Sequence, residues 1–239
     1  MVTLTIVIPA FEEEKKIARD VQAAAKFLVS QNFAGEVIVA DDGSSDETVA
    51  RASEPIIPPS VHRAVIRSGT HRGKGSALRN GILASQGEYV MFADSGLTIP
   101  YDNALPGLRL LQAGASELAH GSRELPGSVI RIDRDWDRKI LSRAFHTVML
   151  MWMHLPRWLT DTQCGFKLYR GDIARQLYAE CTTDGFMFDI EILLRALRHG
   201  YRIAEFPVEW TCDRNSRLGI RRNSREILRE LLQIRRTLF

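Results

Sequence analysis

The sequence has few cysteines and no long apolar run. Its three cysteines, Cys164, Cys181 and Cys212, are far apart and form no CxxC or Cys/His spacing, which argues against a disulfide framework or a zinc site. The longest uncharged stretch, residues 144–156, has 13 residues, whereas a membrane-spanning helix needs about 20. The N-terminus shows no secretion-signal pattern. We therefore expect a cytoplasmic protein, peripheral on the cytoplasmic face of a membrane.

Basic and acidic residues are balanced in number but not in position. The 32 Lys and Arg against 29 Asp and Glu leave a net charge of +3, which does not indicate a nucleic-acid partner. Residues 214–239 hold eight arginines and two glutamates, a local charge of +6. Such a segment fits a phosphate-rich partner or an anionic membrane surface, and a solvated helix face is the alternative.

The first hundred residues alternate strand-like runs with helical patterns. Strands are predicted at Thr5–Pro9, Val37–Ala40, Ala64–Ile66 and Glu88–Ala93. Helical patterns cover residues 17–28 and 71–84. This alternation, with 45% hydrophobic residues for a packed core, predicts an α/β fold: a Rossmann-like, mainly parallel sheet flanked by helices.

The second half of the chain has a mixed pattern. Predicted strands are Glu117–Gly121, Phe166–Tyr169, Arg202–Phe206 and Val208–Thr211. Pro207 separates the last two, which we expect at a sheet edge because proline is tolerated there. The segments 172–180 and 188–199 are predicted helices.

Acidic residues follow two of the predicted strands. Asp41 and Asp42 come directly after one strand, and Asp94 follows another. The carboxyl ends of parallel strands meet at one crevice, where a nucleotide or its metal binds. Asp41 or Asp42 could accept hydrogen bonds from a base or ribose, and Asp94 could hold a divalent ion. The alternatives are an Asp-Gly turn at Gly43 and a carboxylate that caps the loop after Asp94.

A glycine-rich segment, Arg72-Gly73-Lys74-Gly75, precedes a predicted helix. Free backbone N–H groups at such a helix start, together with the Lys74 ammonium, suit a diphosphate. The segment is not a P-loop, because the GxxxxGK[ST] spacing is absent.

Six short motifs occur in one order along most of the chain. They are Ile8-Pro9-Ala10-Phe11-Glu12-Glu13-Glu14, Val39-Ala40-Asp41-Asp42-Gly43-Ser44-Ser45-Asp46, Gly73-Lys74-Gly75, Phe92-Ala93-Asp94-Ser95-Gly96, Gly121-Ser122-Arg123 and Asp161-Thr162-Gln163-Cys164-Gly165-Phe166-Lys167. This series resembles glycosyltransferase family 2, and within it the polyprenyl-phosphate branch of dolichyl-phosphate glucosyltransferases and dolichyl-phosphate mannose synthases. The last motif especially resembles the glucosyltransferases.

The resemblance implies a GT-A fold that uses a nucleotide sugar and a divalent metal, Mg²⁺ or Mn²⁺, with inversion at the anomeric carbon. It places Asp94 as the metal ligand and first acid of a DxD-type motif, and Gly96 stands where the second acid is usual. The residues implied at the nucleotide are Pro9, Phe11, Glu13, Asp41, Asp42, Lys74 and Ser95.

Arginines are implied at the acceptor phosphate. Arg123, with Arg131 and Arg143, would hold it, and Arg214 and Arg217 resemble a basic segment that closes over donor and acceptor. The expected catalytic residues are Asp94, Arg123 and Arg214. A phosphate monoester is already ionised at neutral pH, so its transfer needs orientation and stabilisation of the leaving diphosphate more than a base.

A sugar hydroxyl as acceptor would instead require a carboxylate base. Asp161 and Asp189 are the candidates for that role, although helix capping explains Asp189 equally well.

The resemblance leads to a division of the chain and a function. We expect one domain over residues 1–239, with a nucleotide-binding half (1–100), a mixed acceptor half (101–212) and a basic C-terminal segment (213–239). The expected reaction moves a hexose from UDP-glucose, or GDP-mannose, to a polyprenyl phosphate. A soluble phosphorylated acceptor and an inactive sugar-nucleotide-binding module are the alternatives.

The Met- and Trp-rich stretch 144–159 is the candidate for peripheral contact with the membrane. Such a segment could lie in the membrane interface and receive a polyprenyl chain. A buried core helix is the alternative reading of the same residues.

Overall fold

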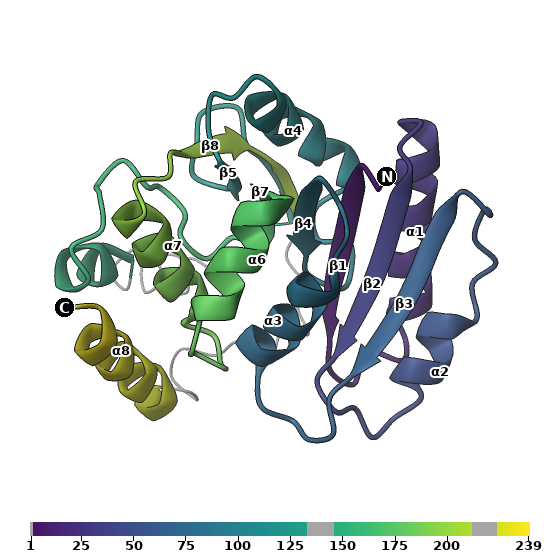
Figure 1. The fold of residues 1–239 in the computed structure, drawn as a ribbon, viewed down its shortest axis with the longest axis horizontal. Helices are drawn as coiled ribbons and strands as arrows, with labels where there is room; N and C mark the ends of the chain where they lie inside the picture. Colours follow the sequence, from purple (N-terminus) through teal and green to yellow (C-terminus); the bar gives the residue numbers. More distant parts are fainter. Residues whose placement is uncertain (1, 133–145, 212–223) are drawn as a thin grey trace.

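The computed structural model describes residues 2–132, 146–211 and 224–239. Its main feature is a seven-stranded sheet with the strand order β3-β2-β1-β4-β7-β5-β8 (Figure 1). Strand β7 is antiparallel to both of its neighbours, and the other neighbouring pairs in this sheet are parallel. The predicted α/β fold with a mainly parallel sheet is therefore confirmed.

The first half of the chain forms the parallel part of the sheet. Its elements are β1 (Leu4–Ala10), α1 (Ile17–Ser30), β2 (Gly35–Asp41), α2 (Thr48–Ser53), β3 (Val61–Arg67), α3 (Lys74–Ala84) and β4 (Tyr89–Ala93). The four strands and the helices α1 and α3 each contain or closely match a predicted segment. Side chains of β1 alternate between faces: Ile6 and Ile8 pack in the core on the side of α1, and Val7 packs on the side of α3.

The second half completes the sheet and adds a smaller one. Its elements are η1 (Tyr101–Asn103), α4 (Ala104–Gln112), β5 (Leu118–Ser122), β6 (Val129–Ile132), β7 (Phe166–Arg170), α6 (Gly171–Glu180), α7 (Phe188–Arg198), β8 (Ile203–Pro207), β9 (Glu209–Thr211) and α8 (Ser224–Leu238). Strand β8 lies at the sheet edge, as predicted for a strand that ends in Pro207. The predicted strand at 208–211 is also an edge strand, but of the smaller sheet, because β9 leaves the main sheet and pairs with β6.

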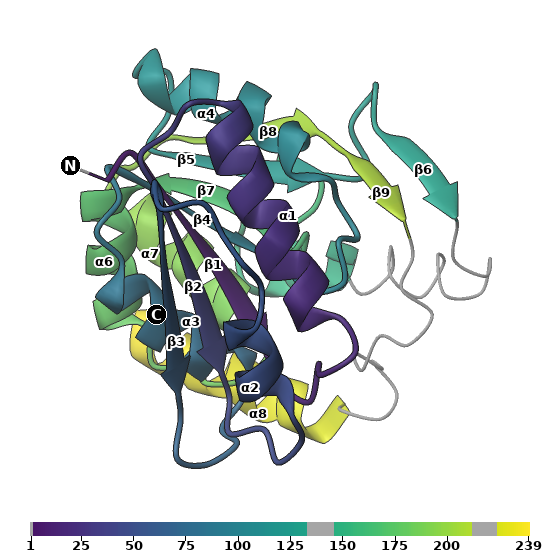
Figure 2. The ribbon, with the colours of Figure 1, turned by 90° about the vertical axis from the view of Figure 1, so that its right-hand side faces the viewer.

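Helices cover both faces of the sheet. The cores contain α1 and α4 side chains on one face and those of α3, α6 and α7 on the other, an arrangement that Figure 2 shows from the side. Helix α8 packs outside α7, together with residues of the stretch 149–159, in a third core. No helix within the described ranges has both the length and the apolar character to cross a bilayer.

Candidate active site

The carboxyl ends of β1, β2 and β4 lie at the same edge of the sheet, because these strands are parallel neighbours. Asp41 ends β2, Asp42 follows it, and Asp94 follows β4. In Figures 1 and 2 this edge is at the bottom of the molecule, where the arrows of β1, β2 and β3 point. The prediction that the strand-end acids lie at one edge of the sheet is therefore confirmed.

Asp41 forms the turn that leaves β2. Its carboxylate is buried and accepts hydrogen bonds from the backbone N–H of Gly43 and Ser44, both at 3.1 Å. Gly43 has φ +80°, and a Cβ there would come 2.8 Å from the backbone of Thr70. The alternative interpretation of the Asp-Gly motif as a turn is therefore correct for Asp41. This turn also places the backbone at Gly43 beside the residues that lead into the glycine-rich loop.

Asp42 binds that loop directly. Its two carboxylate oxygens accept hydrogen bonds from the backbone N–H of Arg72 (3.1 Å) and Gly73 (2.7 Å). Nδ1 of His71 also lies 2.7 Å from Asp42 Oδ2, and the His71 ring stacks on Phe11 with 3.9 Å between ring centroids. His71 therefore contacts two residues predicted to hold the nucleoside. We did not predict this histidine, and its place directly before the glycine-rich segment was the signal available.

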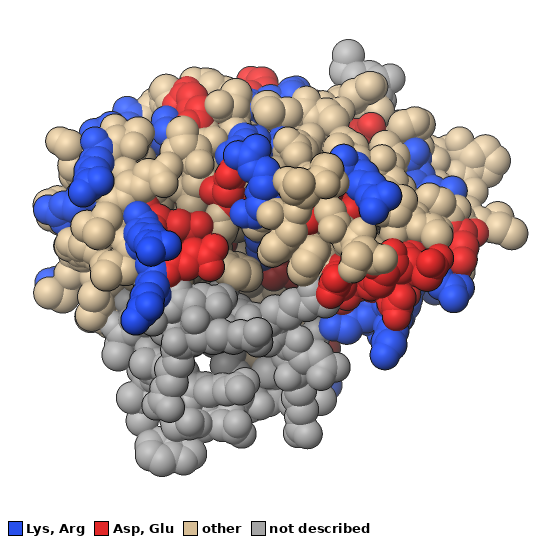
Figure 3. Space-filling view, turned by 90° about the horizontal axis from the view of Figure 1, so that it is seen from below, with Lys and Arg blue, Asp and Glu red and all other residues tan. Residues whose placement is uncertain are grey.

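The loop after β1 is attached to the loop after β2. Glu12 N–H donates to Ser44 Oγ at 2.8 Å and Glu13 N–H donates to Thr48 Oγ1 at 2.7 Å, and the Glu13 carboxylate pairs with Lys16 at 3.5 Å. These bonds fix the backbone that follows Phe11. Figure 3, which views this edge from below, shows Asp and Glu side chains gathered at its right.

The start of α3 does not offer the free N–H groups that the sequence predicted. Gly75 N–H donates to the Gly185 carbonyl (3.2 Å) and Ser76 N–H to the Asp184 carbonyl (3.0 Å). A Cβ on Gly75 would come 2.5 Å from the Thr183 carbonyl oxygen. The glycines thus allow the 183–185 backbone to approach and cap the helix. The predicted backbone cradle for a diphosphate is wrong, and the Lys74 side chain remains.

Lys74 points to Asp94. Its Nζ lies 2.5 Å from Asp94 Oδ1, and it also lies over the rings of Phe92 and Phe188, 5.6 and 5.7 Å from their centroids. Burial lowers the pKa of Lys74, but the carboxylates of Asp94 and Asp189 outweigh this effect, so the net shift is upward. Lys74 is therefore a fixed ammonium ion beside the strand-end acid.

Gly165 makes room for the Asp94 carboxylate. The Asp94 N–H donates to the Gly165 carbonyl at 2.9 Å. A Cβ on Gly165 would come 2.0 Å from Asp94 Oδ2. The two residues come from different halves of the chain, so the second half sets the position of the Asp94 carboxylate.

A buried acid on α1 holds the loop that follows Asp94. Asp20 Oδ2 accepts the Gly96 N–H at 2.6 Å, and Arg19 Nη2 donates to the Gly96 carbonyl at 3.1 Å. Burial raises the pKa of Asp20 to about 6, although the Gly96 hydrogen bond opposes this shift. Gly96, which stands where the family has a second acid, is thus bound through its backbone by an acid that we did not predict.

Arg123 forms a buried two-point ion pair. Its Nε and Nη2 donate to the Asp161 carboxylate at 2.6 and 2.8 Å. Burial acts to raise the pKa of Asp161, but Arg123 outweighs it and leaves the pKa lowered. Glu205 accepts the Asp161 N–H at 3.0 Å and holds this segment in place. A carboxylate so paired is a weak base, which argues against the base role considered for Asp161.

Asp189 pairs with Lys167 in the core. Lys167 Nζ donates to Asp189 and, at 2.8 Å, to the Thr162 carbonyl. Burial raises the pKa of Asp189, although Lys167 and Lys74 oppose the shift. Helix capping does not explain Asp189, because it lies inside the first turn of α7 and Met187 is at the N-cap position.

These residues form one charge cluster of three carboxylates and three cations. Its members are Lys74, Asp94, Arg123, Asp161, Lys167 and Asp189. The pairs also interact with one another electrostatically, because the charge of Asp94 raises the pKa of Arg123 and the charge of Asp189 raises the pKa of Lys74. Lys167 belongs to the motif at 161–167, and no role was predicted for its side chain. The signal for it was a lysine at an inward position of a predicted strand.

The remaining predicted residues are not all at this cluster. Pro9 lies within β1, and Ser95 follows Asp94 in the same loop. Arg131 is exposed on β6, where its Nε lies 2.7 Å from Glu209 Oε1. The predictions for Arg143, Arg214 and Arg217 lie outside the described residues.

A divalent metal at this edge would have Asp94 as its carboxylate ligand, because Asp41 and Asp42 bind backbone N–H groups. Among residues 2–132, 146–211 and 224–239, no group of three or more His, Cys, Asp or Glu side chains is placed to bind a metal. Mg²⁺ commonly takes one or two protein carboxylates, substrate phosphates and water. Asp94, which is partly exposed at the strand end, fits that pattern.

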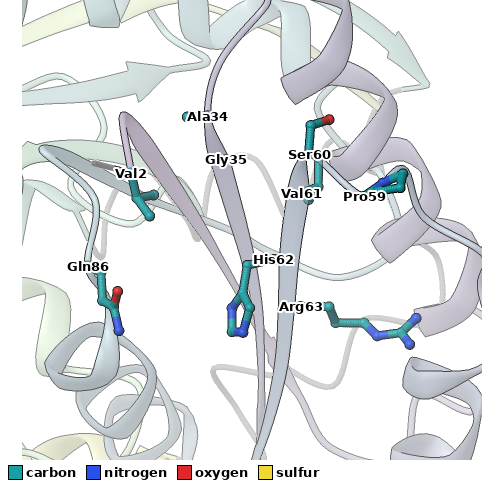
Figure 4. Close-up of a pocket in the computed structure, with 9 residues that line it drawn as sticks. All are labelled: Val2, Ala34, Gly35, Pro59, Ser60, Val61, His62, Arg63 and Gln86. Atoms are coloured by element: carbon teal, nitrogen blue, oxygen red, sulfur yellow. The ribbon is translucent and has the colours of Figure 1, made fainter.

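A separate open pocket lies at the other end of the strands. Val2, Gly35, Val61, His62 and Gln86 are among its lining residues (Figure 4). Because it is at the amino ends of β2 and β3, the length of these strands separates it from the strand-end acids. It belongs to no predicted site.

We predict that Gly165→Ala destabilises the protein by about 1–3 kcal/mol, because the added Cβ overlaps the Asp94 carboxylate. Urea unfolding measures the change. The matched control is Gly69→Ala, whose Cβ would meet nothing within 4 Å and which should change stability by less than about 0.5 kcal/mol. Equal effects of the two substitutions would contradict the packing argument.

We predict that Asp20→Asn removes a pH dependence of stability. The raised pKa of about 6 means that folded Asp20 binds a proton that the unfolded chain has already lost, so wild-type stability falls as pH rises from about 4 through 6. The loss is on the order of 3 kcal/mol for a shift of about two units. Asparagine keeps an acceptor for the Gly96 N–H. Urea unfolding at pH 4.5 and pH 8 should show that the free energy of unfolding falls less between these pH values in the variant than in wild type. An equal fall in both proteins would exclude this contribution of Asp20.

Known proteins are similar to this chain in sequence and in fold. The family model described as Glycosyl transferase family 2 matches residues 5–177. A dolichyl-phosphate beta-glucosyltransferase of Dictyostelium discoideum is 30% identical over 97% of this chain and 73% of its own length. The human protein of the same name is 31% identical over 90% of this chain and 69% of its own length.

The solved structures show the same fold. Glucosyl-3-phosphoglycerate synthase from Mycobacterium tuberculosis, in complex with Mn²⁺, uridine-diphosphate-glucose and phosphoglyceric acid, matches with a TM-score of 0.69 at 22% identity, over 98% of this chain and 79% of that chain. At this identity the likeness concerns the fold, which is GT-A. With the family match over residues 5–177, it follows that the chain belongs to glycosyltransferase family 2 and is a glycosyltransferase.

Proposed function

We propose that this enzyme transfers a hexose from a nucleotide sugar to a polyprenyl phosphate of the dolichyl type, with inversion. UDP-glucose is the first choice of donor and GDP-mannose the second. The observation that carries the proposal is the Lys74–Asp94 pair at the edge where Asp41 and Asp42 also lie. The names of the relatives at about 30% identity support the glucosyl donor and the dolichyl phosphate acceptor.

The nucleoside binds beside the loops that follow β1 and β2. Phe11 offers a ring for stacking, and Asp42 has carboxylate oxygens at the same place. We propose Pro9, Glu13 and Asp41 as further residues of the nucleoside site. His71 contacts both Phe11 and Asp42, so the nucleobase of the donor competes with His71 for these two residues.

Lys74 and Asp94 act at the diphosphate. Asp94, with Ser95 beside it, would hold Mg²⁺ or Mn²⁺, and the metal would neutralise charge on the diphosphate oxygens. Lys74 supplies a positive charge that does not depend on pH near neutrality, since its pKa is raised. Lys74, and the metal that Asp94 would hold, would therefore stabilise the nucleoside diphosphate as it leaves.

The acceptor phosphate needs no protein base. One of its oxygens attacks the anomeric carbon, the bond from that carbon to the diphosphate oxygen breaks, and the diphosphate leaves with the electron pair. The configuration inverts because attack and departure occur on opposite faces. Arg123 is placed beside Asp161, and we propose it with Arg131, Arg143, Arg214 and Arg217 as the acceptor-phosphate group, with Arg214 also acting on the leaving diphosphate.

We predict transfer of label from UDP-glucose to dolichyl phosphate in the presence of Mn²⁺, measured as counts in the organic phase. Asp94→Asn should lower this rate by about 100-fold or more, because it removes the carboxylate that would hold the metal at the diphosphate. The control is Asp172→Asn, an exposed carboxylate on α6. Label that stays in water-soluble products in the presence of a phosphorylated small acid would favour a soluble acceptor. Tight nucleotide binding without any turnover would favour an inactive binding module.

We predict that His71→Ala strengthens UDP binding by about five-fold, because the free enzyme no longer has to break the ring stack and the contact with Asp42. Isothermal titration with UDP measures the change. The control is His62→Ala, another exposed histidine that lies in the pocket at the other end of the strands. Weaker binding by His71→Ala would show that the ring contacts the nucleotide instead of competing with it.

A further inference from the structure

Helix α8 has an inner face whose packing determines which side chains point outward. Ile227, Leu231, Ile234 and Leu238 are buried in the third core, against residues of α7 and of the stretch 149–159. Glu230 also faces inward and accepts the Met187 N–H at 3.0 Å. The rotation of the helix about its axis is therefore fixed.

The outer face of α8 combines leucines with arginines. Leu228 and Leu232 are 50% and 39% exposed, and they lie four residues apart on one side of the helix. Arg225, Arg229 and Arg236 are exposed as well, and by the helical repeat they lie beside these leucines. In the described part of α8 no acid falls on this face: Glu230 points inward and Glu226 lies to one side. We call these five residues the α8 outer face.

The neighbouring stretch exposes large apolar residues too. Met151 and Trp158 are 64% and 51% exposed. The stretch is joined to α8, because Arg235 Nη1 donates to the Trp152 carbonyl at 2.7 Å. The sequence left a membrane interface and a core helix as alternatives for residues 144–159; in its described part, some side chains are buried in the third core and others are exposed.

Helix α8 lies on the same side of the molecule as the active site. Figures 1 and 2 both place α8 at the bottom, where the strands of the nucleotide-binding half end. One loop links it to the site: Glu230 of α8 binds Met187 N–H, and the Gly185 carbonyl of this loop accepts the N–H of Gly75, next to Lys74. A surface bound to α8 is therefore next to the place where the acceptor phosphate is required.

We propose that the α8 outer face docks on an anionic membrane surface, with Leu228 and Leu232 inserted among the lipids and Arg225, Arg229 and Arg236 on the phosphates. Exposed apolar side chains flanked by arginines are the pattern of a helix that lies in the membrane interface. The proposal deepens the proposed function, because a polyprenyl phosphate resides in a membrane. The docking proposal goes beyond the proposed function because it names the surface of the protein that binds the membrane.

The test is co-sedimentation of the full chain with vesicles of phosphatidylcholine alone or with about one third phosphatidylglycerol. Wild type should bind only the anionic vesicles, and less as salt is raised. Arg225→Gln/Arg229→Gln/Arg236→Gln should weaken this binding by about 100-fold, since each arginine near an anionic surface contributes about five-fold. Leu228→Ser/Leu232→Ser should weaken it as well.

Matched controls lie on helices away from α8. Lys26→Gln/Arg51→Gln/Arg109→Gln removes three exposed cations from α1, α2 and α4, and Val29→Ser/Leu83→Ser removes two exposed apolar side chains from α1 and α3. Both should bind the anionic vesicles as wild type does. Equal losses of vesicle binding in the control and α8 variants would overturn the proposal. A wild-type dimer that Leu228→Ser/Leu232→Ser dissociates would also overturn it, because the α8 outer face would then bind a second copy of the chain.

A second measurement separates this proposal from the proposed function. The triple arginine variant should transfer glucose to detergent-solubilised dolichyl phosphate at the wild-type rate, because its substitutions lie outside the site. Intact transfer without vesicle binding by wild type would overturn the docking surface alone. Vesicle binding without transfer would overturn the proposed function alone.

Discussion

Two buried ion pairs beside β4 hold the active site together. Arg123 with Asp161, and Lys167 with Asp189, place charges in the core that are unfavourable unless each has its partner. Removing one member of a buried pair typically costs about 3–5 kcal/mol, because the other charge is left uncompensated. The segments 161–167 and 188–191 therefore have little freedom to move apart, and the Lys74–Asp94 pair is bound between them.

The antiparallel strand β7 makes this arrangement possible. It lies between β4 and β5, and it brings Gly165 next to Asp94 and Lys167 into the core. The parallel half of the sheet supplies the strand-end acids, and the second half supplies the residues that fix the orientation of Asp94. The two halves thus share one site.

Sequence patterns predicted the strands, the flanking helices and the site edge, because burial period and turn residues are local properties. Asp41, Asp42 and Asp94 were predicted for the same reason, because acids after apolar runs are visible in the sequence, and Lys74 was predicted because it lies in a glycine-rich segment. The failures concern partners distant in sequence. The free N–H groups predicted at α3 are capped by residues 184 and 185, and neither His71 nor Asp20 was identified, since their contacts depend on how loops fold back.

The sequence by itself determined the α/β class, the family and the acids at the strand ends, since these depend on local periodicity and on motifs in order. Only the tertiary structure decided which charges pair, that Asp94 meets Lys74 in a space left by Gly165, and which side of α8 faces outward. The physical reason is that a buried charge takes its partner from whatever segment packing brings within a few ångströms, and that choice is not local in the chain.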